Sequence, residues 1–135
     1  MSEENAELLR RAVDAYNRRD VEALCAELDP EVEWHPALPG LLAEQAQAYR
    51  GHAGIGAMFD DFDDVLDLIH FEYSEIHDLG DRVVAIGHIR ARGKASGAET
   101  RSRYANVADV RNGKGIRIRG YLDPEEALEK AGLAE

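Results

Sequence analysis

Three polar side chains in distant parts of the chain could act on a small molecule: His35, Tyr16 and Asn106. Imidazole changes its protonation near neutral pH, so His35 can take and return a proton. The Asn106 carboxamide can donate a hydrogen bond to an oxyanion, but it cannot transfer a proton. Each residue also has a structural interpretation, with its polar atoms satisfied by neighbouring groups. The elements that position these side chains must decide between the two interpretations.

Metal and thiol chemistry have weaker support. The aspartates between residues 60 and 67 alternate around Phe59 and Phe62, as on a solvated helix face, and they lack the glycine-spaced pattern of a calcium loop. The histidines at 35, 52, 70, 77 and 88 show no paired ligand spacing. Cys25 falls on the apolar stripe of a short predicted helix, where a thiol behaves as a small hydrophobe. We therefore expect no metal and no cofactor.

Length and charge narrow the class of protein. A chain of 135 residues is expected to form one domain over residues 1–135. The net charge of −11 repels phosphate backbones, so no nucleic acid is expected as a partner. The chain shows no basic-then-apolar leader and no apolar run approaching the ~20 residues of a membrane span. These features predict a cytoplasmic protein that has no membrane partner.

The first half of the chain predicts helices and one short strand. The expected elements are helices over residues 4–18 and 21–28, a strand over 31–36, and a helix that begins at residue 52 or 53. Asp20 can cap the second helix, and Asp29-Pro30 is expected to end it. Pro36, Pro39 and Gly40 break the strand, and residues 41–51 fit either helix or loop.

The second half of the chain switches to the period of β-strands. The expected strands cover residues 68–78, 82–92, 100–111 and 115–122. Asn112-Gly113 tolerates the positive φ angles of a tight hairpin. Asp123 as N-cap and Pro124 at the first helical position start a final helix, which Gly132 can end. Helices followed by antiparallel strands predict an α+β domain with helices on one face of the sheet.

Strand alternation predicts which side chains face the interior. On the strand over 82–92 the small or apolar set is Val83, Ala85, Gly87, Ile89 and Ala91, which leaves His88 and Arg90 outside or in a dimer contact. On the last strand Ile116, Ile118, Gly120 and Leu122 are expected to face inward, because guanidinium groups are costly to bury. On the strand over 31–36, Val32 and Trp34 point one way, whereas Glu33 and His35 point the other.

Motifs spread over nearly the whole chain resemble the nuclear transport factor 2-like superfamily, and its SnoaL-like branch in particular. They are Tyr16-Asn17-Arg18-Arg19-Asp20, Leu28-Asp29-Pro30-Glu31-Val32-Glu33-Trp34-His35-Pro36, Tyr49-Arg50-Gly51-His52, Gly80-Asp81-Arg82-Val83-Val84, Asn112-Gly113-Lys114 and Tyr121-Leu122-Asp123. The resemblance implies a curved, mostly antiparallel sheet that forms a cone around the N-terminal helices, with an apolar cavity and a short C-terminal helix. Members often pair through the outer face of the sheet, so a homodimer is expected.

The resemblance also implies roles for individual residues. Tyr16 is similar to the tyrosine with which ketosteroid isomerases of this superfamily hold a developing enolate. His35 lies where those isomerases carry a catalytic aspartate followed by proline. Asn106 lies where they place a protonated aspartic acid, and where SnoaL-type cyclases place a histidine. These three are the expected catalytic residues, and the expected ligand contacts are Tyr104, Ile118, Gly120, Phe59 and Ile89.

The chain departs from the catalytic patterns of its relatives. Gly120 stands where SnoaL-type cyclases have an acid, and Gly87 and Ile89 stand where limonene epoxide hydrolases carry Arg-x-Asp. Two hypotheses therefore stay open. The first is an enzyme without cofactor that transfers protons on a small apolar oxygenated molecule, as an isomerase, cyclase or dehydratase does. The second is a non-catalytic module that binds a small ligand or a protein partner.

Overall fold

The computed structural model describes residues 2–37 and 48–132 of the chain. The elements in chain order are α1 (Ser2–Arg18), α2 (Val21–Ala26), β1 (Leu28–His35), β2 (Tyr49–Arg50), α3 (Gly51–Val65), β3 (Leu66–Asp78), β4 (Arg82–Gly93), β5 (Glu99–Arg111), β6 (Lys114–Tyr121) and α4 (Pro124–Ala131). The expected α+β fold is confirmed. The predicted break at Pro39-Gly40 and most of the ambiguous segment 41–51 lie outside the described residues.

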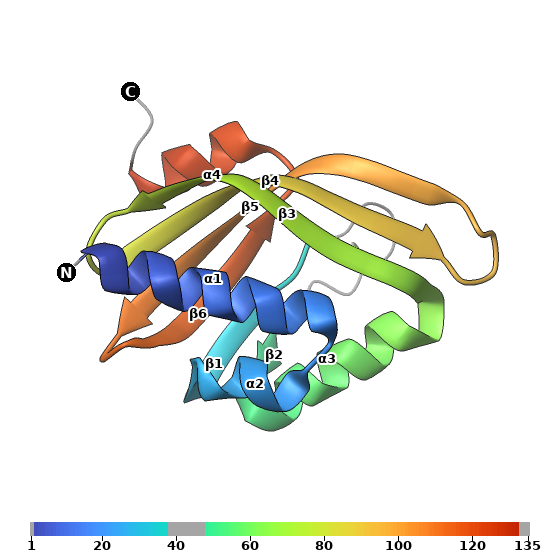
Figure 1. Ribbon diagram of the computed structural model, residues 1–135, viewed down its shortest axis with the longest axis horizontal. Helices are drawn as coiled ribbons and strands as arrows, with labels where there is room; N and C mark the ends of the chain where they lie inside the picture. The colour runs from blue at the N-terminus through green and yellow to red at the C-terminus, as the bar shows by residue number, and fades with distance from the viewer. Residues whose placement is uncertain (1, 38–47, 133–135) are drawn as a thin grey trace.

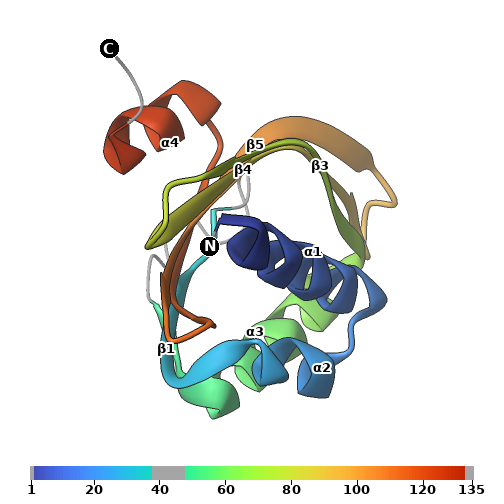
Figure 2. The same cartoon turned by 60° about the vertical axis from the view of Figure 1, so that its left-hand side comes forward.

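The strands form one curved sheet in the order β2-β1-β6-β5-β4-β3. Neighbours run antiparallel except β1 and β6, which pair in parallel and place Trp34 beside Ile118. Figure 2 shows the sheet curving around α1, which crosses its concave face, with α2 and α3 beneath. Figure 1 shows α4 on the opposite, convex side. The expectation that all helices lie on one face of the sheet is therefore wrong for α4, which packs on its own apolar cluster there. The result is an unclosed cone whose interior lies between α1 and the concave face.

Local sequence signals explain several boundaries. The Asp20 carboxylate accepts a hydrogen bond from the amide of Ala23 at 3.0 Å and so caps α2. Asn112 and Gly113 take φ angles of 55° and 74°, as the tight β5–β6 turn requires. The final helix starts at the N-cap Asp123 and ends at Gly132, whose φ is 86°. These predictions from neighbouring residues are confirmed.

The largest boundary difference from expectation lies between the second helix and the first strand. Helix α2 ends at Ala26, and β1 already begins at Leu28, so Asp29-Pro30 lies inside a strand and does not end the helix. The reason is tertiary: Leu28 pairs with Gly115 of β6, and the amide of Gly115 donates to the carbonyl of Glu27. Pairing with a distant strand outweighed the local stop signal of a proline.

A side-chain amide fixes α1 to the sheet. Asn17 donates from Nδ2 to the carbonyl oxygen of Phe71 and accepts from the amide of Phe71, both at 2.9 Å. It thus replaces a strand partner at one position of β3, which forms the edge of the sheet. This contact sets the position of the helix that carries Tyr16 relative to the strands that carry the rest of the site.

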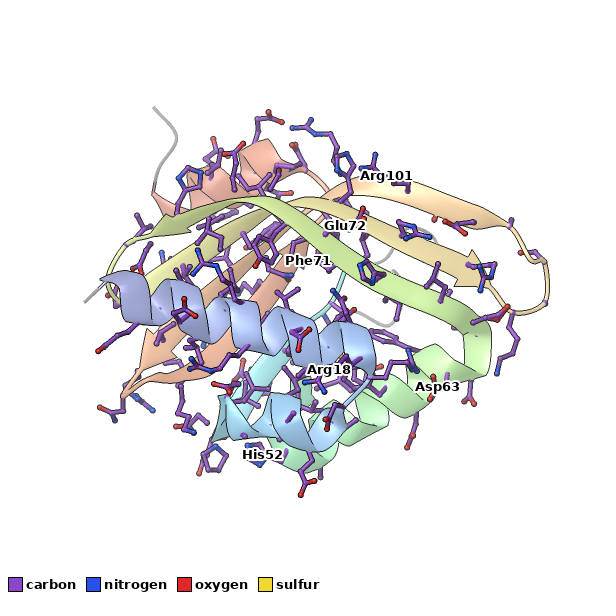
Figure 3. The ribbon with its side chains drawn as sticks, in the orientation of Figure 1. Arg18, His52, Asp63, Phe71, Glu72 and Arg101 are labelled. Carbon is purple, nitrogen blue, oxygen red and sulfur yellow. The ribbon has the colours of Figure 1, made fainter. Side chains whose placement is uncertain are left out.

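The two faces of the sheet have different character. The inner face packs on α1 and α3 through a core that includes Val32, Leu24, Ile55, Met58 and Phe62. On the convex face, α4 covers a smaller apolar cluster formed by Val84, Ala105, Val107, Ala127 and Ala131. Beyond α4 that face carries charged pairs, among them Arg101 with Glu72, which are labelled in Figure 3. In the part of the chain that is described, no helix has the length and apolar character to cross a membrane.

Candidate functional site

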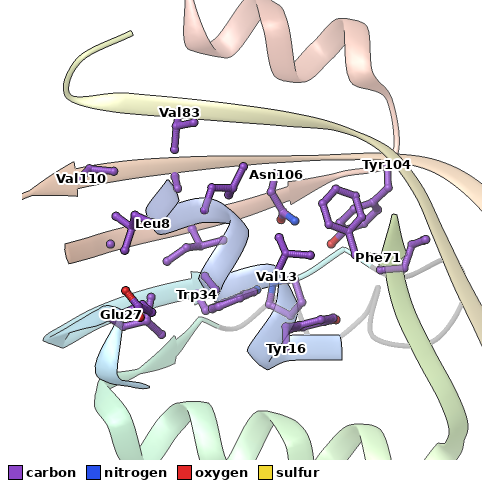
Figure 4. A pocket seen from close by; sticks show the side chains of 18 of the residues that line it. Leu8, Val13, Tyr16, Glu27, Trp34, Phe71, Val83, Tyr104, Asn106 and Val110 are labelled. Carbon is purple, nitrogen blue, oxygen red and sulfur yellow. The ribbon is translucent and has the colours of Figure 1, made fainter. Parts of the chain in front are cut away.

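A mostly apolar cavity lies between α1 and the concave face of the sheet, and Figure 4 shows it from close by. Its lining residues are Leu8, Leu9, Ala12, Val13, Tyr16, Glu27, Leu28, Trp34, Pro36, Phe62, Phe71, Val83, Ile89, Tyr104, Asn106, Ala108, Val110, Gly115 and Ile118. The space open to the centre of a water molecule is about 50 Å³. Since one water needs about 10–15 Å³ of such space, the cavity has room for a few waters or one small ring.

Tyr16 enters this cavity from α1. Its ring stacks on Trp34, with centroids 5.8 Å apart, and touches Phe59 at 5.5 Å. Burial raises the pKa of the Tyr16 phenol well above its usual value, the nearby Tyr104 raises it further, and Arg19 opposes the rise. The phenol therefore keeps its proton at neutral pH and can act as a hydrogen-bond donor.

Tyr104 comes from β5 and depends on a glycine of the next strand. Its hydroxyl accepts a hydrogen bond from the amide of Ala37 at 3.3 Å, and its ring packs edge-on against Phe71 at 5.7 Å. A Cβ atom at Gly120 would overlap the Tyr104 hydroxyl, so the missing side chain leaves the room that the phenol fills. Burial raises the pKa of Tyr104 to about 12. The neutral phenol of Tyr104 therefore fills the space beside Gly120, the position at which an acid was expected from the resemblance to SnoaL-type cyclases.

Asn106 lies two residues further along β5, with its carboxamide directed into the cavity beside Tyr104 (Figure 4). Its Oδ1 atom is buried and has no hydrogen-bond partner among the described residues. The residues directly across from it on β4 and β6 are Ala85 and Gly120, neither of which offers a polar side chain. Among the described lining residues, Oδ1 of Asn106 is therefore the one buried side-chain polar atom without a partner.

His35 lies elsewhere. It is absent from the lining, to which its neighbour Trp34 contributes. His35 and Glu33 share the other face of β1, where the Nε2 atom of His35 lies 3.2 Å from Oε1 of Glu33. Glu33 also meets Arg50 at 2.6 Å and Arg117 at 3.7 Å. The pKa of the Glu33 carboxyl is lowered from its usual value, first by the hydrogen bond with His35 and then by these arginines. The structure thus brings Tyr16 and Asn106 together and leaves His35 in a surface charge cluster.

The expected ligand contacts divide in the same way. Tyr104, Ile118 and Ile89 line the cavity, whereas Phe59 stands behind Tyr16 and Gly120 lies behind the Tyr104 hydroxyl. The sequence interpretation did not select most of the other lining residues, and Trp34 and Glu27 are two examples. Trp34 could have been found from its alternation with Glu33 and His35, and it faces inward beside Ile118.

Glu27 is a lining residue with a charged side chain, and it too was not selected. It follows directly after α2, and the two oxygens of its carboxylate accept hydrogen bonds from Arg11 at 3.1 and 3.2 Å. No pattern in the sequence marks it, because it is the residue between a helix and a strand. Within residues 2–37 and 48–132, no group of three histidine, cysteine, aspartate or glutamate side chains could hold a metal ion.

A curved sheet that wraps a helix and encloses an apolar cavity defines the cystatin-like α+β cone of NTF2-like proteins. Comparison with protein families agrees, because the SnoaL-like domain family matches residues 9–118. The chain therefore belongs to the SnoaL-like domain family. The comparison with curated proteins gave no match.

Solved structures show the same fold. An NTF2-like protein of unknown function from Burkholderia pseudomallei has a TM-score of 0.78 at 21% identity, covering 93% of this chain and 95% of its own. TerC, co-crystallised with polyporic acid, has a TM-score of 0.78 at 24% identity over 93% and 96%. An NTF2-like protein from Burkholderia xenovorans has a TM-score of 0.75 at 27% identity over 97% of both chains. Other similar structures include a putative polyketide cyclase and a protein with a ketosteroid isomerase-like fold.

Proposed function

We propose that this protein binds a small, largely apolar, oxygenated molecule in the cavity between α1 and the concave face of the sheet. The observation that carries the proposal is the composition of the lining, in which apolar side chains surround the polar groups of Tyr16, Tyr104 and Asn106. Such a combination of apolar walls and few polar groups is typical of ligand sites. Two similar structures were obtained with small molecules, TerC with polyporic acid and a Catenulispora acidiphila protein with trimethylamine.

The cavity size sets the expected affinity. A six-membered ring with two one-atom substituents, such as p-xylene, has about eight heavy atoms, and at roughly 0.5 kcal/mol per atom it would gain about 4 kcal/mol. That free energy corresponds to a dissociation constant of about 1 mM. The natural ligand would bind more tightly if it extends beyond the ring, but small probes must be titrated into the millimolar range.

Trp34 provides a built-in reporter, because it lines the cavity and is the single tryptophan of the chain. We expect p-xylene and p-cresol to change its fluorescence in a saturable way. Ala12→Leu places a larger side chain in the cavity and should abolish the change. The matched control Ala6→Leu, on the same helix but outside the lining, should leave it intact. Binding that survives Ala12→Leu, or no saturable response to any probe, would reject the proposal.

A second candidate is a proton-transfer enzyme that acts on the same ligand. It is favoured by the presence of Tyr16 and Asn106 in one mostly apolar lining, where these two neutral donors can stabilise an oxyanion. His35 is the base expected from the sequence, but it is absent from the lining and would have to leave Glu33 to reach the cavity. Full turnover by His35→Ala on an identified substrate would remove His35 from this mechanism.

We also propose a homodimer in the cytoplasm. The expected contact surface is the convex face, where the part beyond α4 carries arginines and carboxylates that pair within one chain, such as Arg90 with Glu99 at 3.1 Å and Arg92 with Asp67 at 3.5 Å. Sedimentation over a range of protein concentrations tests the dimer. A monomer at all concentrations would exclude it.

A further inference from the structure

The side chain of Asn106 has a buried oxygen for which the described residues supply no hydrogen-bond donor. A buried polar atom without a hydrogen bond costs free energy, so a ligand that satisfies it gains affinity. The unpartnered atom is Oδ1, which is an acceptor. The Tyr104 hydroxyl oxygen lies against Gly120 and accepts from the amide of Ala37, and it makes no hydrogen bond with this atom of Asn106. The missing partner is therefore a hydrogen-bond donor from outside the described residues.

The charge of the surroundings restricts the ligand further. Among the described lining residues, the one charged side chain is Glu27, and both of its oxygens are held by Arg11. Tyr16 and Tyr104 keep their protons at neutral pH because burial raises their pKa. An anion would enter an apolar space without a cation to pair with, inside a protein of net charge −11.

We infer that the cavity takes a neutral ligand that carries a hydroxyl or N–H group, and that this group donates a hydrogen bond to Oδ1 of Asn106. The inference rests on the proposed ligand-binding function and names the chemical class of the ligand. It differs from an oxyanion site, in which Asn106 would act through its N–H group alone. A hydroxyl fits particularly well, because it can donate to Oδ1 and accept from Nδ2 when the carboxamide turns over.

Four para-substituted toluenes of similar shape separate these requirements. The second substituent is a methyl group in p-xylene, a hydroxyl in p-cresol, a methoxy group in 4-methylanisole and a carboxylate in 4-methylbenzoate. Each is titrated at pH 7 against the full chain, with Trp34 fluorescence as the readout. We expect p-cresol to bind about fivefold or more tightly than p-xylene and 4-methylanisole, since one satisfied hydrogen bond is worth about that factor. We expect 4-methylbenzoate to bind most weakly.

Asn106→Leu provides the matched variant, because leucine has similar size and no polar atoms. The variant should still bind p-xylene, and it should bind p-cresol and p-xylene with about equal affinity. Equal binding of p-cresol and p-xylene by the unchanged protein, a preference that survives Asn106→Leu, or tight binding of 4-methylbenzoate would overturn the inference while leaving the cavity proposal standing. If 4-methylanisole matches p-cresol, an acceptor is what Asn106 requires and the inference also fails. No saturable binding of any of the four would reject the proposed function itself and this inference with it.

Discussion

Gly120→Ala should destabilise the protein far more than an ordinary glycine substitution. The built Cβ would overlap the hydroxyl of Tyr104, approach its Cζ to 2.8 Å and lie 3.2 Å from the amide nitrogen of Ala37. Tyr104 cannot simply swing away, because it is buried, bonded to Ala37 and packed against Phe71. The ring must shift and the bond to Ala37 must break, so the substitution disturbs both β5 and the end of β1.

The magnitude follows from two contributions. Overpacking of a well-filled interior costs about 1–3 kcal/mol, and loss of a hydrogen bond of ordinary strength costs about 1 kcal/mol. We therefore expect Gly120→Ala to lower the free energy of unfolding by about 2–4 kcal/mol. Gly56→Ala in α3 is the matched control, because its Cβ would meet nothing within 4 Å. That control should raise stability by about 0.5–1 kcal/mol, the usual gain of alanine over glycine in a helix.

A double-mutant cycle in urea tests the stated cause. Tyr104→Phe removes the overlapping oxygen, so Gly120→Ala should cost at least about 1 kcal/mol less in that background than alone. Rescue remains partial because the ring carbon still lies close to the new methyl group. Additive effects of the two substitutions, or a Gly120→Ala protein as stable as the Gly56→Ala control, would refute the reasoning.

Two further predictions concern α1 and the buried phenols. Asn17→Ala leaves both backbone groups of Phe71 without their partner and should cost about 2–4 kcal/mol, with faster hydrogen exchange at the Phe71 amide; unchanged exchange there would contradict it. For Tyr104, the unfolded chain releases the phenol proton near pH 10.0, whereas the folded protein keeps it until about pH 12. Stability should therefore be independent of this group below pH 10 and fall by up to about 3 kcal/mol between pH 10 and 12. Tyr104→Phe should flatten that fall in alkaline unfolding experiments, and an equally steep fall in the variant would exclude Tyr104 as its source.

Signals carried by neighbouring residues were predictable from the sequence. The Asn112-Gly113 turn, the helix start at Asp123 and the inward face of β4 depend on local backbone preference and on alternation, which operate within a few residues. The same alternation placed His35 with Glu33 and opposite Trp34, as the structure has it. Its position in the cavity was implied by resemblance alone, and the geometry of β1 does not supply it.

Contacts between distant strands were not predictable. The parallel pairing of β1 with β6 moved a strand start to Leu28 in spite of the following proline, because ladder bonds to Gly115 decide that boundary. Glu27 joined the cavity lining for the same reason. The packing of α4 on Val84 and Val107 was likewise not predictable, because it depends on a contact between distant segments and not on a pattern of neighbouring residues.

The sequence by itself determined the α+β class, the order of the main helices and strands and the inward face of β4, because propensity, capping and alternation are properties of short segments. It did not place Leu122, which was expected to face inward and is exposed beyond the end of β6. Only the tertiary structure decided which polar groups share the cavity. Tyr16 and Asn106 meet because Asn17 fixes α1 against β3 and the sheet curves around it. Gly120 is explained by the Tyr104 hydroxyl that fills its space, a contact set by the register of two strands and visible only once they are paired.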